Sequence, residues 1–281
     1  GTFMLLAINA ARRNSVSQSL DPADLLRRIC HNIVGIDLNP LAVIAARTNY
    51  LLALGPLLAH RGKDSLEIPV YLADSIMTPQ RGTQDLWEDK VVRVWLSIGK
   101  IEIPKRLATQ EGVARLTLLL DRGLQHDPAP LSPEEFIAKG RDYLVKAYLE
   151  DVADTKAAWA DDAPVVHALY ARLLELHRQG RNGMWARILK NAFAPIFLAP
   201  FDFVAGNPPW IGWENLPEAY RDESKSLWHE HGLFVHSGMD TILGKGKKDI
   251  SMLLTSVAAD SYLKMGGKMG LVITQAVFKM A

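Results

Sequence analysis

The stretch that decides the fold is "HNIVGIDLNPLAVIAARTNYLLAL", residues 31–54. It opens with a short apolar run that ends at Asp37, as a buried strand does. Asn39 and Pro40 then favour a tight turn, and the apolar residues after them recur at helical spacing. The sequence therefore predicts a strand, a turn and a helix in succession.

Further apolar runs along the chain have the same strand-like character. "IPVYLADSIM" at 68–77 closes on an acid, Asp74, while "FDFVAGN" at 201–207 and "KMGLVITQ" at 268–275 have the length and composition of buried strands. Because helical segments separate these runs, we expect a parallel α/β sheet.

The region between the strand-like runs at 68–77 and 201–207 is expected to be an insertion made mostly of helices. Residues 91–107 contain strand-like stretches around Gly99, and about residues 108–195 are helical. Ser132 and Glu135 have the spacing of a capping box at a helix start. We treat residues 1–281 as one core that contains this insertion.

A glycine- and lysine-rich stretch at 237–249 is expected to be a loop ahead of a further helix. Asp249 is suited to cap this helix, and the pair Gly266-Gly267 is suited to end it. The lysines of the loop fit either contact with nucleic-acid phosphates or simple solvation; they are Lys245, Lys247 and Lys248.

Composition excludes several classes of protein. The 281 residues are 48% hydrophobic with a net charge of +1, so any nucleic-acid partner must meet a local basic face. The single cysteine, Cys30, excludes an internal disulfide framework and favours the cytoplasm. No export signal or membrane span is apparent. The chain begins at Gly1 and stops just after a strand-like run, as an excised piece would.

Polar residues close three of the predicted strands. Ligands of open α/β sheets bind outside the carboxyl ends of the strands, so Asp37, Asp74 and Asn207 are expected to converge on one crevice. Asp37 is suited to accept hydrogen bonds from ribose hydroxyls, and Asp74 with Ser75 to bind the exocyclic amine of an adenine. The ring would lie against Leu38 or Ile76. Each acid alone also fits a helix cap or a turn.

The string Asn207-Pro208-Pro209-Trp210 is suited to activate an aromatic amine or an amide NH₂, whose lone pair is delocalised. The Asn207 side-chain oxygen and the Pro208 carbonyl oxygen would each accept one N–H and return electron density to the nitrogen. The prolines would hold this geometry, and Trp210 would stack on a planar base. The alternative is a proline-rich turn with Trp210 packed in the core.

Other polar and aromatic side chains point to function less strongly. His229, His231 and His236 lack cysteine partners, so we expect no metal site there. Trp213 and Trp228 are expected to pack the loop instead of contacting a base.

These motifs resemble the catalytic region of S-adenosylmethionine-dependent N6-adenine DNA methyltransferases of restriction-modification systems, with type IIG-like and related phage-defence enzymes closest in style. Residues 35–54 resemble the second motif of the family, "LADSIM" at 72–77 the third, and "FDFVAGNPPWIG" at 201–212 the fourth. Residues 246–274 resemble the helix and strand that follow, and "GTF" at 1–3 resembles the tail of the first motif.

The resemblance implies a role for each matching position. Asp37 would bind the cofactor ribose, Asp74 the cofactor adenine amine, and Gly1 and Thr2 its amino-acid part. Asn207 to Trp210 would bind the target base. The order of motifs is similar to the gamma arrangement of N6-adenine enzymes.

The resemblance also implies a Rossmann-like class I methyltransferase sheet, truncated at both ends. A strand and most of the glycine loop would precede Gly1, and further strands and a target-recognition domain would follow. Double-stranded DNA is the implied substrate, and a nuclease domain of the parent protein is a further implied partner. Two alternatives stay open: transfer to a protein glutamine or an RNA guanine amine, and a non-catalytic DNA-binding fragment.

Overall fold

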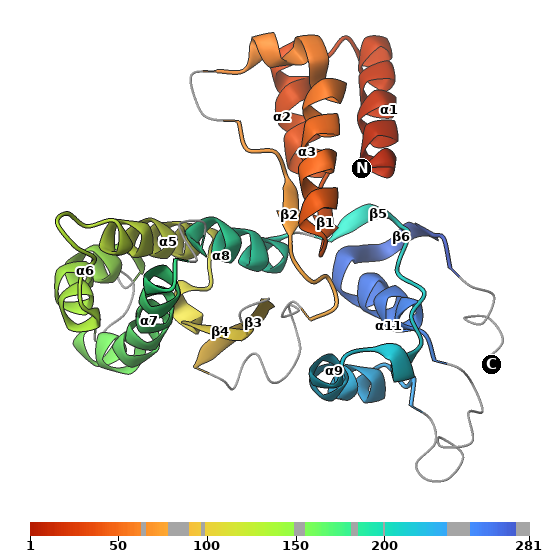
Figure 1. Ribbon diagram of the computed structural model, residues 1–281. Coiled ribbons are helices and arrows are strands. Elements are labelled where there is room, and N and C mark those ends of the chain that lie inside the picture. Colours follow the sequence, from red (N-terminus) through yellow and green to blue (C-terminus); the bar gives the residue numbers. More distant parts are fainter. Residues whose placement is uncertain are drawn as a thin grey trace. The chain divides into compact units, whose positions relative to one another are not determined.

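The computed structural model describes residues 1–62, 66–77, 90–96, 99–148, 155–180, 185–198, 200–234 and 248–273. The chain forms two compact units. The first comprises Gly1–Val70, Ser75–Met77 and Leu198–Ala281, and the second comprises Tyr71–Asp74 and Thr78–Phe197. The described residues are mixed α/β, mostly helical, with three two-stranded sheets (Figure 1).

The first unit begins with three packed helices, α1 (Thr2–Gln18), α2 (Pro22–Asn32) and α3 (Pro40–Leu54). A 3-10 helix, η1 (Gly55–His60), continues α3. Figure 1 shows α1, α2 and α3 side by side. The Tyr50 hydroxyl lies in the buried interior of this unit and joins α3 to α2 through the carbonyl oxygens of Ile29 and Ile33, each at 3.0 Å.

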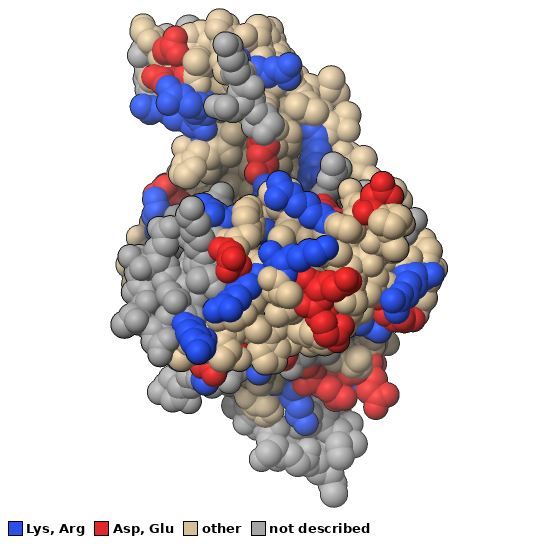
Figure 2. Space-filling model, turned by 90° about the vertical axis from the view of Figure 1, so that its left-hand side faces the viewer, with Lys and Arg blue, Asp and Glu red and all other residues tan. Residues whose placement is uncertain are grey.

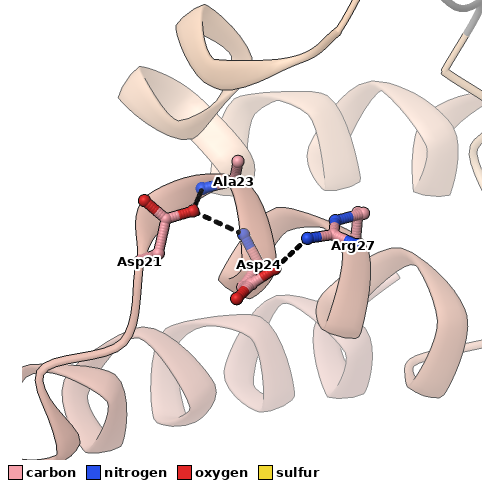
Figure 3. A network of polar contacts seen from close by, with 4 residues as sticks. All are labelled: Asp21, Ala23, Asp24 and Arg27. Atoms are coloured by element: carbon pink, nitrogen blue, oxygen red, sulfur yellow. Dashed lines mark hydrogen bonds and ion pairs between the residues drawn. The ribbon is translucent and has the colours of Figure 1, made fainter.

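Short-range capping fixes where α2 begins. The Asp21 carboxylate accepts hydrogen bonds from the Ala23 N–H at 3.0 Å and the Asp24 N–H at 3.1 Å (Figure 3). Pro22 occupies the first helical position, where no N–H is required. Asp24 also forms an ion pair with Arg27 on the surface of the helix.

The predicted strand-turn-helix unit is confirmed. Strand β1 (Gly35–Asp37) ends at the predicted acid, and Asn39 caps α3 by accepting hydrogen bonds from the Leu41 and Ala42 N–H groups at 2.9 and 3.3 Å. Strand β1 pairs with β2 (Val70–Leu72), and the Arg47 guanidinium donates a hydrogen bond to the Val70 carbonyl oxygen at 2.9 Å.

The rest of the first unit contains β5 (Phe201–Gly206) and β6 (Leu263–Leu271), which pair in parallel. Between them along the chain are η4 (Trp213–Asn215), α9 (Glu218–Glu230) and α11 (Ile250–Val257). A π-helical turn, η5 (Ala258–Tyr262), connects α11 directly to β6. The buried core here contains Ile76, Leu216, Trp228, Ile250, Leu253 and Val257.

The prediction that Gly266 and Gly267 end a helix is wrong. Both glycines lie inside β6, at a shift in its pairing register with β5: Phe201 faces Leu263, but Phe203 faces Lys268. Gly266 has a φ of +78°, a conformation that glycine adopts without strain and that suits a bulge. The glycines therefore absorb extra residues in a strand.

The prediction that residues 201–206 form a buried strand is also wrong, because Phe203 is 73% exposed. A fully buried parallel strand needs neighbours at both edges and cover on both faces. Within the described residues β5 has only β6 as its partner.

The described residues of the second unit form an antiparallel hairpin and four α-helices. The hairpin comprises β3 (Val91–Leu96) and β4 (Gly99–Pro104), as the strand-like stretches around Gly99 predicted. A short 3-10 helix, η2 (Lys105–Leu107), leads into α5. The remaining elements are α5 (Gln110–Leu124), α6 (Pro133–Tyr148), α7 (Thr155–Arg178), α8 (Trp185–Phe193) and η3 (Ala194–Phe197).

The helices of this unit surround one apolar core in which the Phe136 and Tyr170 rings stack with centroids 3.9 Å apart. The capping box is confirmed, since Ser132 Oγ accepts the Glu135 N–H at 3.2 Å and Glu135 accepts the Ser132 N–H at 2.9 Å. Figure 2 shows Lys and Arg side chains interspersed with Asp and Glu on the described surface that faces the viewer.

One described segment, Pro40–His60, is long and apolar enough by composition to cross a bilayer. Its residues Val43, Ala46 and Tyr50 are buried, but Leu41, Ile44 and Leu52 are exposed and only 28% of the apolar window is buried. Core helices of soluble proteins also have this character, so the segment is no firm sign of a membrane protein.

Candidate functional site

The loop from Asn207 to Trp213 begins directly after β5, as predicted. Asn207 is exposed, Pro208 is buried and Pro209 is exposed. The Val272 N–H donates a hydrogen bond to the Gly206 carbonyl oxygen at 3.0 Å, so the first residue of the loop starts from a fixed strand end. The amide of Asn207 is thus presented to solvent on a backbone that two prolines stiffen.

Trp210 lies on the surface of this loop and is 56% exposed. Its indole Nε1–H donates a hydrogen bond to the Val272 carbonyl oxygen at 3.1 Å. The alternative in which Trp210 is a core residue is therefore wrong, and the hydrogen bond restrains the orientation of an exposed aromatic ring.

The far end of the loop is held by the residues that precede α11. The Ile250 N–H donates to the Ile211 carbonyl oxygen at 2.9 Å, and the Trp213 N–H donates to the Lys248 carbonyl oxygen at 2.7 Å. Gly212 and Asp249 therefore form an isolated antiparallel bridge. The loop is fixed both to the end of β6 and to the start of α11.

An aromatic cluster packs against the end of the loop at Trp213. Trp213 meets Trp228 and Phe234 edge-on, with ring centroids 5.2 and 4.9 Å apart, and Trp228 stacks on Phe234 at 5.2 Å. Trp228 is fully buried. The prediction that Trp213 and Trp228 pack the loop is confirmed.

Lys248 lies beside this cluster, with its Nζ 5.1 Å from the centroid of the Phe234 ring. Burial lowers the pKa of the Lys248 ammonium group. Lys245, Lys247 and His236 lie outside the described residues.

The residues assigned to the amino-acid part of a cofactor lie at the start of α1. Thr2 is the first residue of the helix, and the Gly1 carbonyl oxygen accepts the Leu5 N–H at 3.1 Å. A Cβ placed on Gly1 would lie 3.2 Å from the Ala46 Cα, so a side chain at this position would crowd the α3 backbone.

Asp37 is exposed at the end of β1, and one of its carboxylate oxygens accepts the Asn39 N–H at 2.8 Å. This bond orients the carboxylate and is also the turn-forming contact that the alternative interpretation expected. Leu38 is 64% exposed next to it.

Asp74 and Ser75 follow β2, at the point where the chain passes from one unit to the other. The Ser75 carbonyl oxygen accepts a hydrogen bond from the Tyr262 hydroxyl at 3.2 Å. Ile76 is buried in the core beside Trp228, so it is not available to a ligand ring. Of Leu38 and Ile76, the two residues proposed to lie against the adenine ring, only Leu38 is exposed.

The structure brings some of the predicted site residues together and not others. Asn207 and Trp210 share one restrained loop, and Gly1 lies against α3. Strands β1 and β5 belong to different two-stranded sheets within the described residues. The convergence of Asp37, Asp74 and Asn207 on one crevice stays a prediction.

Two contributors to the loop were not assigned to the site from sequence. Val272 acts through its main-chain atoms, which leave no signal in a side-chain pattern. Asp249 was expected only as a helix cap, and its pairing with Gly212 across the sequence had no local signal.

Two other features lie apart from the predicted site. His231 Nδ1 is 3.1 Å from Asp260 Oδ2, and the described residues contain no group of side chains that suits a metal ion. A surface hollow of about 560 Å³ is lined by residues of α1, α2 and η1, Arg12, Arg13 and Leu57 among them, and by none of the predicted site residues.

Comparisons of the chain with protein-family models, curated proteins and solved structures give no match.

Proposed function

We propose that this protein is a DNA adenine-N6 methyltransferase that uses S-adenosylmethionine and acts on an adenine flipped out of the duplex. The observation that supports it best is the loop geometry. The Asn207 amide and the Trp210 ring are both exposed on one loop, and the loop is restrained at both ends by hydrogen bonds.

The residues of this loop have the chemistry that amine methylation needs. Asn207 Oδ1 and the Pro208 carbonyl oxygen would each accept one N–H of the exocyclic amine. These acceptors return electron density to the nitrogen and stabilise the positive charge that develops on it during transfer. Trp210 would hold the base in plane by stacking.

The residues at the start of α1 and the end of β1 fit the cofactor in chemical type. S-adenosylmethionine, when bound, supplies an electrophilic methyl group on its sulfonium sulfur. Asp37 has an exposed carboxylate suited to ribose hydroxyls, and Asp74 and Ser75 would bind the adenine amine. Gly1 lies close against α3, where a Cβ would be 3.2 Å from the Ala46 Cα, and Thr2 follows at the helix N-terminus.

The finer architecture belongs to the same proposal. The two parallel strands β5 and β6 and the β1–α3 unit are parts that a Rossmann-like class I methyltransferase sheet contains. A target-recognition domain, and in the parent protein a nuclease, would supply sequence specificity and cleavage. The enzyme would act in the cytoplasm.

A nucleobase substrate is favoured over a protein glutamine by Trp210. A flat indole face that is 56% exposed matches a planar base, whereas a glutamine side chain gains little from such a platform.

The test uses the protein expressed as its complete reading frame, with double-stranded DNA and methyl-labelled S-adenosylmethionine. N6-methyladenine in the product is measured by mass spectrometry, and cofactor binding by calorimetry. Asn207→Ala should abolish transfer and leave cofactor affinity within about threefold, because Asn207 is proposed to contact the target amine and not the cofactor. Asp37→Ala should weaken cofactor binding at least about tenfold, as expected when hydroxyl groups lose the carboxylate that accepts their hydrogen bonds.

Matched controls are Asn215→Ala, at an exposed residue that follows the loop, and Asp222→Ala, at an exposed residue of α9. Both should retain transfer and binding. Equal loss of cofactor binding in the Asn207 and Asp37 variants would contradict the separate roles. Transfer to RNA or to a glutamine peptide, with none to DNA, would replace the proposed substrate.

A further inference from the structure

We infer that Asp249 is a positioning residue for the loop Asn207–Trp213. The inference rests on the proposed function only for its effect on methyl transfer, because its structural part concerns the conformation of the loop itself. Asp249 touches neither of the groups proposed to contact the substrate, and it acts through the main chain on either side of it.

Asp249 belongs to two structures at once. Its backbone is extended, with φ −116° and ψ 140°, and forms the bridge with Gly212. Its side-chain oxygen accepts the Ser251 N–H at 2.7 Å, and its carbonyl oxygen accepts the Met252 N–H at 2.9 Å. The residue that pairs with the loop is therefore the residue that starts α11.

The helix behind this cap is fixed in the core. Ile250, Ser251 and Leu253 are buried, and Ile250 and Leu253 belong to the cluster that contains Trp228. A capped, buried helix start leaves the N–H of Ile250 and the carbonyl of Lys248 little freedom. These are the two groups that bond the loop, to Ile211 and to Trp213.

Loss of the cap should therefore weaken the main-chain hydrogen bonds of the loop as well as those of the helix. Without the Asp249 carboxylate the Ser251 N–H, which is buried, has no acceptor and the first turn of α11 opens more often. Each opening frees the Lys248 and Ile250 main chain from its partners. The loop is then restrained only at its other end, where Val272 bonds Trp210 and Gly206.

The experiment compares Asp249→Ala, Asp249→Asn and Asp21→Ala in the complete protein. Asp21→Ala is the matched control, because Asp21 also caps a helix of the first unit; its carboxylate accepts two main-chain N–H groups, whereas that of Asp249 accepts one (Figure 3). Hydrogen–deuterium exchange is measured at single amides by NMR. Asp249→Ala should speed exchange at Trp213 and Ile250 by about fivefold, the factor expected for loss of one N-cap.

Asp249→Asn should restore both amides to within about twofold of wild type, because asparagine caps as well as aspartate does. Asp21→Ala should leave them unchanged. Unchanged exchange in Asp249→Ala, or an equal increase in Asp21→Ala, would overturn the inference.

Methyl transfer supplies the second readout. Asp249→Ala should lower kcat and leave the KM for S-adenosylmethionine unchanged, with recovery in Asp249→Asn. If loop exchange rises in Asp249→Ala while kcat is unchanged, the loop is not positioned for catalysis and that part of the inference fails. If the wild-type protein methylates no substrate, the proposed function fails while the exchange comparison still decides the structural role of Asp249.

Discussion

The Trp210 indole N–H and the Val272 carbonyl oxygen are joined by a hydrogen bond of 3.1 Å, although 62 residues separate them in sequence. The bond runs from an exposed aromatic ring to the residue that follows β6. It gives the loop after β5 a fixed aromatic face without burying that face.

Two substitutions of Trp210 should distinguish the contribution of its aromatic ring to DNA binding from that of its hydrogen bond. Trp210→Phe keeps an aromatic face and loses one neutral hydrogen bond, so the KM for DNA should rise no more than about fivefold. Trp210→Ala removes the stacking surface, worth about 1–3 kcal/mol, so KM should rise by about tenfold or more. Steady-state kinetics with both variants tests this. Equal effects of Phe and Ala would argue against stacking.

Gly123 of α5 is expected to be intolerant of a side chain. A Cβ at this position would lie 2.7 Å from Phe136 Cδ2 and 2.8 Å from Tyr170 Cε2, within a stacked pair of rings. Gly123→Ala should therefore lower the free energy of unfolding by about 1–3 kcal/mol through overpacking. Urea unfolding followed by circular dichroism measures this change.

Gly140 of α6 is the matched control for that prediction. A Cβ there would lie 2.7 Å from one methyl group at the end of the Leu119 side chain, which can move to another rotamer. Alanine also has the better helix propensity, so Gly140→Ala should change stability by less than about 1 kcal/mol. If both alanine variants lose the same stability, close packing at Gly123 is not the cause.

Asp162 should make the second unit less stable as pH rises. Burial raises the pKa of its carboxyl group above the ordinary 3.8, with partial compensation from Arg106 at 3.0 Å. A carboxyl group with a raised pKa in the folded state binds its proton more tightly when folded. Stability therefore falls as pH rises from about the unfolded value of 3.8 through the folded-state pKa.

Asp162→Asn should remove that part of the pH dependence, so its stability relative to wild type should increase across the same pH range. Urea unfolding at a series of pH values measures the difference. Asp161→Asn, at the neighbouring and more exposed acid that pairs with Lys90, is the control. A variant whose stability follows wild type at every pH would show that Asp162 does not titrate in this way.

The capping box at α6 should have the opposite pH dependence. Hydrogen bonds from the Ser132 main chain and side chain lower the pKa of Glu135. The stabilisation that the Glu135 carboxylate contributes to the folded state is therefore present above its unfolded-state pKa and is lost as pH falls through its folded-state pKa. Ser132→Ala should cost about 1 kcal/mol at neutral pH, as loss of an N-cap does. Urea unfolding at pH 7 and at pH 3 gives the free energy of unfolding at each pH. Ser132→Ala keeps the main-chain N–H that the Glu135 carboxylate accepts, so Glu135→Ala is the variant that tests the carboxylate. If the cost of Glu135→Ala is the same at both pH values, ionisation of Glu135 takes no part.

The site could be predicted from sequence as far as its residue types and their place at strand ends. Asn207 follows β5 and Asp37 closes β1, as the apolar runs before them indicated. Exposure could not be predicted, since Ile76 and Leu38 were equivalent candidates and only Ile76 is buried. Burial depends on which distant segments cover a residue, and a short sequence pattern contains no information about them.

By itself the sequence determined the local elements: the Asn39 cap, the capping box at Ser132 and Glu135, and the cap at Asp249. Each depends on atoms within four residues of one another, so residue type and spacing are sufficient. Tertiary structure alone decided the bond from Trp210 to Val272, the bridge from Gly212 to Asp249, and the inclusion of Gly266 in β6. These pair main-chain groups from distant segments, and every residue offers a carbonyl oxygen, so partner choice is settled by the packing of the whole unit.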